Sequence, residues 1–138
     1  MTVLVAYDGS EPARKAVAYT LEEHHDDDVV LLRVVELAGG STGAGIELAR
    51  EKLRERRKQA ETTTADQLEE LLESTASEVL LETAVGDPDE AIVEYATEHD
   101  IDHVIVGSHG RKGVTRMLLG SVAEAVVRNA PCPVTVVR

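Results

Sequence analysis

The last quarter of the chain reads VIVGSHGRKGVTRMLLGSVAEAVVRNAPCPVTVV (residues 104–137), and this stretch indicates the fold most directly. The apolar run at its start predicts a strand from about residue 103 to 106, and a glycine-rich connection follows. A helix is expected over 121–129, and a last strand over 134–137. The stretch is therefore one strand–helix–strand unit, and strands joined by such a crossover lie parallel.

The same alternation runs through the rest of the chain. Further strands are predicted at 2–7, 29–35 and 78–85, and helices at 11–25, 46–75 and 87–99. An unbroken helix over 46–75 would be longer than a small domain is wide, so we expect a break in it. Asp87 is expected to cap the helix that it begins. Strict alternation predicts one α/β domain, residues 1–138, with a parallel sheet covered by helices on both faces.

Composition excludes several classes of partner. The 138 residues include 14 Lys and Arg against 26 Asp and Glu, for a net charge of −12. Such an excess disfavours binding to nucleic acids and to anionic membranes, both of which need basic surfaces. The sequence has no long apolar run, no signal peptide and a single cysteine, so we expect a cytoplasmic protein. A self-repelling acidic surface tolerates strong screening, so we hypothesise a halophile source; an ordinary acidic cytosolic protein is the alternative.

Two connections could carry chemistry, because ligands in open parallel sheets bind beyond the carboxyl ends of the strands. The first is Asp8-Gly9-Ser10, and the second runs from Gly107 to Ser121. Glycines allow backbone amides to approach an anion, and the start of the next helix offers unpaired N–H groups. Residues 107–138 carry five basic residues against one acid, a net charge of +4 in an acidic chain. This pattern favours an anion site, although the basic residues could instead balance acids on nearby loops.

The stretch after residue 106 resembles the C-terminal signature of the universal stress protein (UspA-like) family. Nucleotide-binding members carry G-x2-G-x9-G-(S/T), which Gly107, Gly110, Gly120 and Ser121 match. The opening VLVAYDGSEPA (residues 3–13) is also similar to that family. The resemblance implies a three-layer Rossmann-like sandwich with a five-stranded parallel sheet in the order 3-2-1-4-5.

The resemblance also implies a binding site for ATP, with Mg²⁺ as a companion ion left open. Asp8 would contact the adenine–ribose half of the ligand, and Ala123 stands where many members have a hydroxyl side chain that contacts phosphate. The full set of expected binding residues is Ala6, Tyr7, Asp8, Val34, Val106, Gly107, His109, Gly110, Gly120, Ser121 and Val122.

Individual residues also have plainer interpretations. Asp8 could be only a turn residue that hydrogen-bonds its own backbone. His109 could be a general base, although shaping the loop is the simpler role. Ser121 could cap the last helix, bind phosphate, or do both. The basic residues at 50–58 alternate with acids, which is typical of a solvated, ion-paired helix face. We expect no metal site, and we expect Cys132 to be an inert packing residue.

Together these features predict an ATP-binding regulatory protein of the stress response, without a dedicated catalytic residue. The alternatives are a dimeric interaction protein that needs no nucleotide, and a slow ATPase. The apolar strand 134–137 would lie at the edge of the sheet, which is a liability unless it is covered. The family resemblance implies that this edge pairs with its copy in a homodimer.

Overall fold

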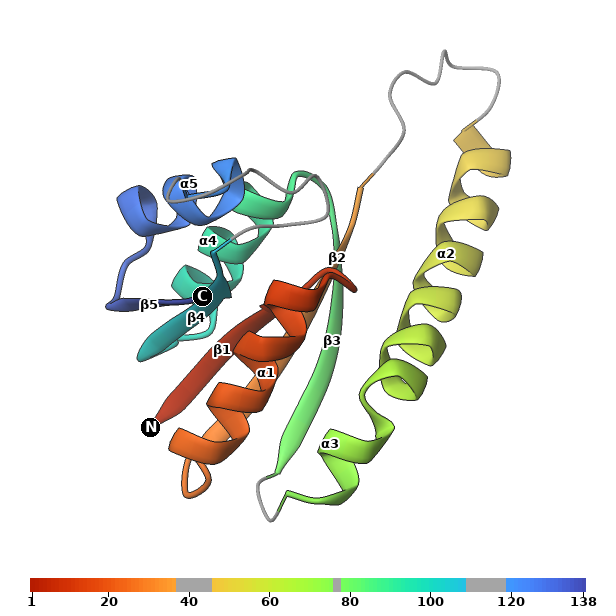
Figure 1. The fold of residues 1–138 in the computed structure, drawn as a ribbon. Helices are drawn as coiled ribbons and strands as arrows, with labels where there is room; N and C mark the ends of the chain where they lie inside the picture. The colour runs from red at the N-terminus through yellow and green to blue at the C-terminus, as the bar shows by residue number, and fades with distance from the viewer. Residues whose placement is uncertain (37–45, 76–77, 109–118) are drawn as a thin grey trace.

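A parallel sheet of five strands forms the centre of the molecule (Figure 1). The computed structural model describes residues 1–36, 46–75, 78–108 and 119–138. The strands lie in the order β3-β2-β1-β4-β5, so the predicted order and the predicted α/β class are confirmed. Their bounds are β1 (Thr2–Tyr7), β2 (Asp28–Val35), β3 (Val79–Val85), β4 (His103–Gly107) and β5 (Val134–Val137).

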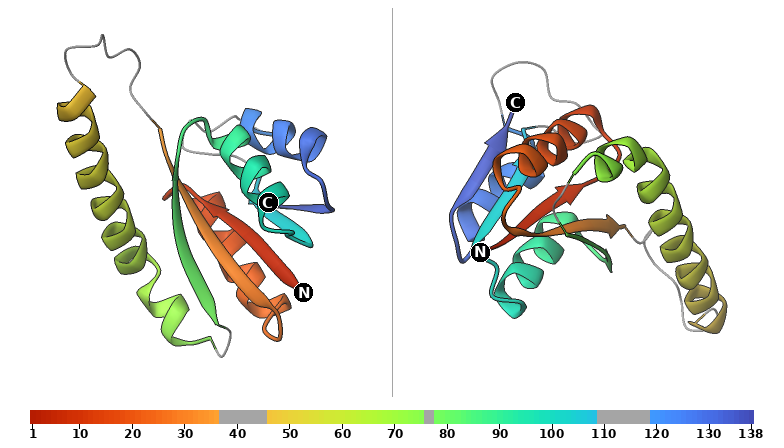
Figure 2. Two further views of the ribbon diagram at one scale, coloured as in Figure 1. Left: turned by 180° about the vertical axis from the view of Figure 1, so that it is seen from behind. Right: turned by 90° about the horizontal axis from the view of Figure 1, so that it is seen from below.

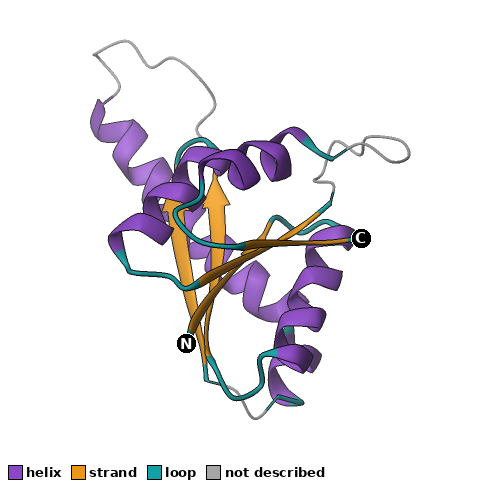
Figure 3. Ribbon diagram, turned by 90° about the vertical axis from the view of Figure 1, so that its left-hand side faces the viewer, coloured by secondary structure: helices purple, strands orange, loops and turns teal. Residues whose placement is uncertain are grey.

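Helices cover the sheet on both faces, as the views from behind and from below show (Figure 2). Figure 3 shows the strands between the helices from the side. The helices are α1 (Glu11–Glu23), α2 (Ile46–Gln67), α3 (Glu69–Glu73), α4 (Pro88–Glu98) and α5 (Ser121–Asn129). The break expected within 46–75 falls at Leu68, a fully buried residue between α2 and α3. None of the helices in the described ranges is both long and apolar enough to cross a membrane.

The core consists of two apolar clusters, one on each face of the sheet. On one face Val5 of β1 packs with Val17 of α1 and with Leu68. On the other face Leu4 packs with Ile92 of α4 and Val126 of α5. Successive side chains of a strand point to opposite faces, so a central parallel strand must be apolar at every position. The clusters thus explain the nearly continuous apolar runs of β1 and β2.

Helix α1 forms as its sequence predicts. Ser10 is the N-cap, and its hydroxyl oxygen accepts a hydrogen bond from the Ala13 N–H at 3.3 Å. Pro12 occupies the first turn, where its missing N–H has no cost. The residues of α1 that recur at three- and four-residue spacing form its buried face; they are Ala13, Ala16, Val17, Thr20 and Leu21. Asp87 differs: it is the N-cap of α4, but its side chain makes no capping hydrogen bond.

Two histidines meet at the amino end of the sheet. The rings of His24 and His103 lie edge to face with centroids 5.5 Å apart. The His103 Nε2 atom lies 2.6 Å from the Thr135 hydroxyl, and the His24 Nδ1 atom lies 2.9 Å from a carboxylate oxygen of Asp27. Burial, and then the neighbouring His24, lower the pKa of His103. His103 is therefore harder to protonate in the folded protein than in the unfolded chain.

The lowered pKa of His103 makes stability depend on pH. The unfolded chain takes up a proton near the ordinary histidine pKa of about 6.5, whereas the folded chain does so only at lower pH. The contribution of His103 is therefore fully present above pH 6.5 and is lost as the pH falls below it. We expect the free energy of unfolding, measured by urea denaturation with far-UV circular dichroism, to fall between pH 7.5 and 5.5. A His103→Gln variant should show a shallower slope, and an unchanged slope would contradict this assignment.

Candidate functional site

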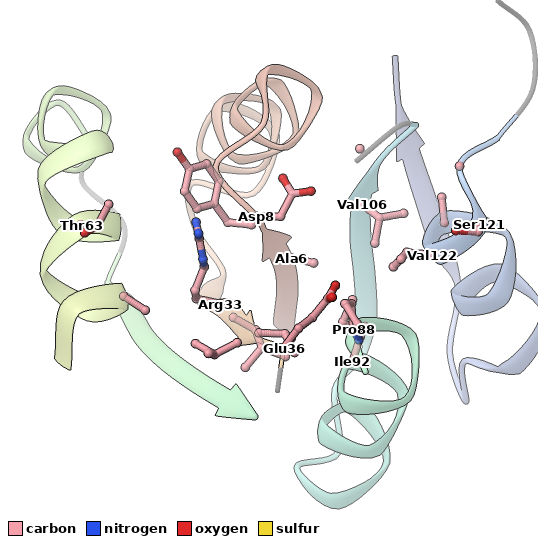
Figure 4. A pocket seen from close by; sticks show the side chains of 18 of the residues that line it. Ala6, Asp8, Arg33, Glu36, Thr63, Pro88, Ile92, Val106, Ser121 and Val122 are labelled. Atoms are coloured by element: carbon pink, nitrogen blue, oxygen red, sulfur yellow. The ribbon is translucent and has the colours of Figure 1, made fainter. Parts of the chain in front are cut away.

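A pocket of about 640 Å³ opens at the carboxyl ends of β1, β2 and β4 (Figure 4). We call it the strand-end pocket. Its wall brings together the predicted site residues Ala6, Tyr7, Asp8, Val34, Val106, Gly107, Gly120, Ser121 and Val122. The other two predicted residues, His109 and Gly110, lie outside the described residues. The pocket lies at the carboxyl ends of the neighbouring strands β1 and β4, where the strand order reverses, which is the expected ligand position in an open parallel sheet.

One side of the pocket is apolar. Val106 of β4 is buried, while Ala6 of β1 and Val34 of β2 are partly buried against the core cluster of α4 and α5. Ile92 of α4 lines the same side. This surface offers aliphatic contacts to a flat ring. No aromatic ring of the described residues lines this side, because the chain has no Phe or Trp and the Tyr7 ring lies in the cluster on the other face of the sheet.

The amino end of α5 supplies the polar side. Gly120 is the N-cap, and its N–H donates to the Ser108 carbonyl at 2.7 Å. The first hydrogen bond of the helix runs from the Glu124 N–H to the Gly120 carbonyl. The N–H groups of the three residues before Glu124 therefore have no acceptor within the helix. The suggestion that Ser121 caps α5 is wrong, because Ser121 is already the first helical residue. Its exposed side chain stands at the pocket instead.

Asp8 takes part in the turn before α1. One of its carboxylate oxygens accepts hydrogen bonds from the Ser10 N–H, at 2.9 Å, and from the Ser10 hydroxyl. The turn role considered for Asp8 is thus present. The residue also lines the pocket, beside the strand end that carries Ala6 (Figure 4). Holding the turn and contacting a ligand are compatible roles for one carboxylate, because each oxygen can accept more than one hydrogen bond.

The Tyr7 side chain lies on the other face of the sheet from Ala6. It is buried in the cluster formed with α1, and its hydroxyl donates to the Gln67 side-chain oxygen at 2.9 Å. The Arg33 guanidinium lies over its ring, 5.6 Å from the centroid. Alternation along β1 is the reason for this placement. A contact between Tyr7 and a ligand held on Ala6 and Val34 would therefore involve its backbone rather than its ring.

Sequence reasoning missed the wall that α2 provides. Arg56, Gln59, Ala60 and Thr63 line the pocket from this helix. The Arg57 guanidinium donates to the Thr83 carbonyl of β3 at 2.9 Å, so Arg57 ties α2 to the sheet. The interpretation of this segment as a solvated, ion-paired face is therefore incomplete: both side chains are exposed, but Arg57 hydrogen-bonds to β3 and Arg56 lines the pocket. The spacing 56, 59, 60, 63, which places four residues on one helical face, was the available signal.

The structure describes only some of the basic residues counted in 107–138. Arg111, Lys112 and Arg116 lie outside the described residues. Arg128 pairs with Glu124 at 2.8 Å on the exposed side of α5. The role of this charge in attracting an anion therefore stays a prediction.

Two histidines and the cysteine outside the pocket make contacts of their own. The His99 ring stacks on the Tyr95 ring with centroids 3.9 Å apart, whereas His103 contacts Thr135. Cys132 is a partly buried free thiol, and burial raises its pKa, which lowers its reactivity at neutral pH. Over the ranges that the structure describes, no group of three or more His, Cys, Asp or Glu residues is placed to hold a metal ion.

Comparison with known proteins gives consistent results. The model of the universal stress protein family matches residues 1–138. A universal stress protein of Thermus aquaticus is 33% identical over 137 residues, covering 99% of this chain and 98% of the relative. Universal stress protein UspA from Lactobacillus plantarum has a TM-score of 0.85 at 27% identity, covering 100% of this chain and 97% of that one. A universal stress protein solved in complex with cAMP has a TM-score of 0.63 at 25% identity, covering 100% and 96%.

Proposed function

The chain belongs to the universal stress protein family, and from this premise we propose that it binds an adenine nucleotide, ATP with Mg²⁺, in the strand-end pocket. In this proposal the protein is a nucleotide-sensing regulatory module of the stress response. Binding shifts the population of its conformations and thereby changes the surface that partner proteins meet. A structurally similar universal stress protein was solved in complex with cAMP, which is also an adenine nucleotide, and this supports an adenine nucleotide as the ligand.

The proposal rests on one observation: the pocket has an apolar side and, facing it, the amino end of a helix. An aliphatic side of Ala6, Val34 and Val106 suits the base, and the amino end of α5 suits the phosphates. Asp8 lies at the pocket wall, where its carboxylate could accept hydrogen bonds from ribose hydroxyls. The residues present therefore fit a nucleotide, and Mg²⁺ would enter with the phosphates.

Isothermal titration calorimetry of Mg·ATP into nucleotide-free protein tests the proposal. We expect saturable binding with one site per chain, and competition by AMP, since both ligands share the adenosine half. GTP should bind more weakly. The proposal would be ruled out if millimolar Mg·ATP gave no heat of binding and AMP did not compete with it, both in dilute buffer and in molar KCl.

Replacing Asp8 with asparagine should weaken ATP binding about tenfold, through loss of charge-assisted hydrogen bonds. The amide oxygen of asparagine can still accept the hydrogen bonds from Ser10, so the turn and the fold should persist. Calorimetry gives the affinity, and Asp66→Asn is the matched control because Asp66 is exposed on α2 and does not line the pocket. Equal affinities for the two variants would argue that Asp8 serves only the turn.

We further propose a homodimer that pairs through β5. This strand is at one edge of the sheet and is hydrogen-bonded to β4 on its inner side. An apolar edge strand invites pairing with another strand, and a second copy offers the same edge. Light scattering at micromolar concentration should give twice the mass of the chain. A monomer in molar KCl, where the repulsion of the acidic surface is screened, would contradict this pairing.

A further inference from the structure

The strand-end pocket extends over both faces of the sheet. Ala6 and Val34 belong to the cluster on the α4 and α5 face, and Tyr7 belongs to the cluster on the opposite face. Arg33 follows the same alternation along β2 and lies over the Tyr7 ring. Figure 4 shows Arg33 and Thr63 on one side of Ala6, and Val106, Ser121 and Val122 on the other. A nucleotide with its base on Val34 and its phosphates at Ser121 would occupy only one of these faces.

We call the remaining part of the pocket the α2 compartment, defined by Tyr7, Arg33, Arg56, Gln59 and Thr63. The three residues from α2 share one face of that helix. Each of them is exposed, so this face of the helix is not packed into the core.

Several hydrogen bonds tie α2 to the sheet and to α1. Arg57 donates to the Thr83 carbonyl at 2.9 Å, the Tyr7 hydroxyl donates to Gln67 at 2.9 Å, and Arg14 donates to the Gln67 carbonyl at 2.7 Å. These contacts hold the helix at Arg57 and at Gln67. The side chains of Arg56, Gln59 and Thr63 stay exposed, so they are available to bind a ligand in the pocket.

Charge distinguishes the two parts of the pocket. Asp8 and Glu36 are the carboxylates among the described residues that line it, and Figure 4 shows both on the side of Arg33 that faces away from Thr63 of α2. The α2 compartment has two arginines and no carboxylate in its described wall. None of the ion pairs among the described residues involves Arg56. In a chain with a net charge of −12, this is a local preference for an anion.

We propose that the α2 compartment binds a second phosphate group, through the guanidinium groups of Arg33 and Arg56 and the polar side chains of Gln59 and Thr63. Guanidinium groups recognise phosphate with paired hydrogen bonds, which suits this set of donors. The second phosphate is either on the ribose of the bound adenine nucleotide or a separate anion beside it. The inference rests on the proposed nucleotide site only in the first case.

The test compares three probes by calorimetry at one fixed KCl concentration, because salt screens exposed charges. The probes are AMP, adenosine 3′,5′-bisphosphate and inorganic pyrophosphate. Each is titrated into the wild type, into Arg56→Gln, and into Arg54→Gln as the matched control. Arg54 is exposed on the same helix but does not line the pocket. Both variants remove one positive charge from the surface of α2, so neither should affect folding.

We expect Arg56→Gln to weaken binding of the bisphosphate, of pyrophosphate, or of both by about tenfold, while AMP binding changes less than twofold. Arg54→Gln should resemble the wild type. An effect on the bisphosphate alone assigns the second phosphate to the nucleotide, and an effect on pyrophosphate assigns it to a separate anion. Binding of pyrophosphate that depends on Arg56, without any binding of AMP, would refute the nucleotide site but support the α2 compartment. Equal behaviour of the two variants toward every probe, or no binding of either phosphate-rich probe, would overturn this inference.

Discussion

Replacing Gly107 with alanine is expected to lower the free energy of unfolding by about 3 kcal/mol. A Cβ atom at this position would lie 2.7 Å from the Pro12 carbonyl carbon, 2.8 Å from its oxygen and 3.0 Å from the Ala13 nitrogen. These are backbone atoms in the first turn of α1, so they can yield only if the helix moves away from β4. The melting temperature should fall by about 10 °C. Far-UV circular dichroism is the suitable probe, since the chain has no tryptophan.

Gly86→Ala is the control for Gly107→Ala. Gly86 has a φ of +136°, and a Cβ atom there would meet no heavy atom within 4 Å. Its replacement therefore costs backbone strain alone, about 1–2 kcal/mol. Gly107→Ala should also disturb the strand-end pocket, because Gly107 lines it next to the turn before α1. Wild-type stability for Gly107→Ala would show that β4 and α1 are not in this close contact.

Replacing Gly120 with valine is expected to weaken ATP binding by about 100-fold or more, with the fold retained. Gly120 is buried at the pocket wall and is the N-cap of α5. A branched side chain there would occupy the space through which phosphates reach the N–H groups of the first turn. Its φ of −61° is open to any residue, so the backbone itself should tolerate the change.

The measurement for Gly120→Val is the ATP affinity by calorimetry, alongside the free energy of unfolding by urea denaturation. The lost cap residue and the branched side chain at a buried position should together cost about 1–3 kcal/mol of stability, which leaves the protein folded in dilute buffer. Gly120→Ala should give an intermediate loss of affinity, because its side chain is smaller. If the valine variant binds ATP as tightly as the wild type, the phosphates do not bind at the start of α5.

The fold could be predicted from local patterns because both faces of this sheet are buried. Nearly continuous apolar runs such as 29–35, and the apolar positions in α1 at three- and four-residue spacing, mark elements that pack mainly against other apolar residues. The strand order came from the family resemblance of the glycine motif and the opening strand rather than from these patterns. The break at Leu68 was expected only from length, since no proline or glycine marks it.

The site could be predicted only in part. The turn at Asp8 and the start of α5 belong to strand ends that topology brings together, and sequence reasoning places both there. The α2 wall depends instead on how a long polar helix is held by Arg57 and Gln67. Such hydrogen bonds leave no periodic apolar signal. The orientation of Tyr7 depends on the register of strand alternation in β1. The place of Ser121 depends on whether α5 begins one residue earlier or later, which a sequence rarely determines.

The proposed nucleotide site is tested most directly by following backbone amide resonances of the ¹⁵N-labelled protein while Mg·ATP is added. Such a titration reports binding and its location together. Perturbations should concentrate at Asp8, Val34, Gly107, Ser121 and Val122, which line the strand-end pocket. Residues at the amino end of the sheet, such as His24, should not shift. Unchanged spectra at millimolar ATP, or perturbations confined to surfaces away from this pocket, would contradict the proposed site.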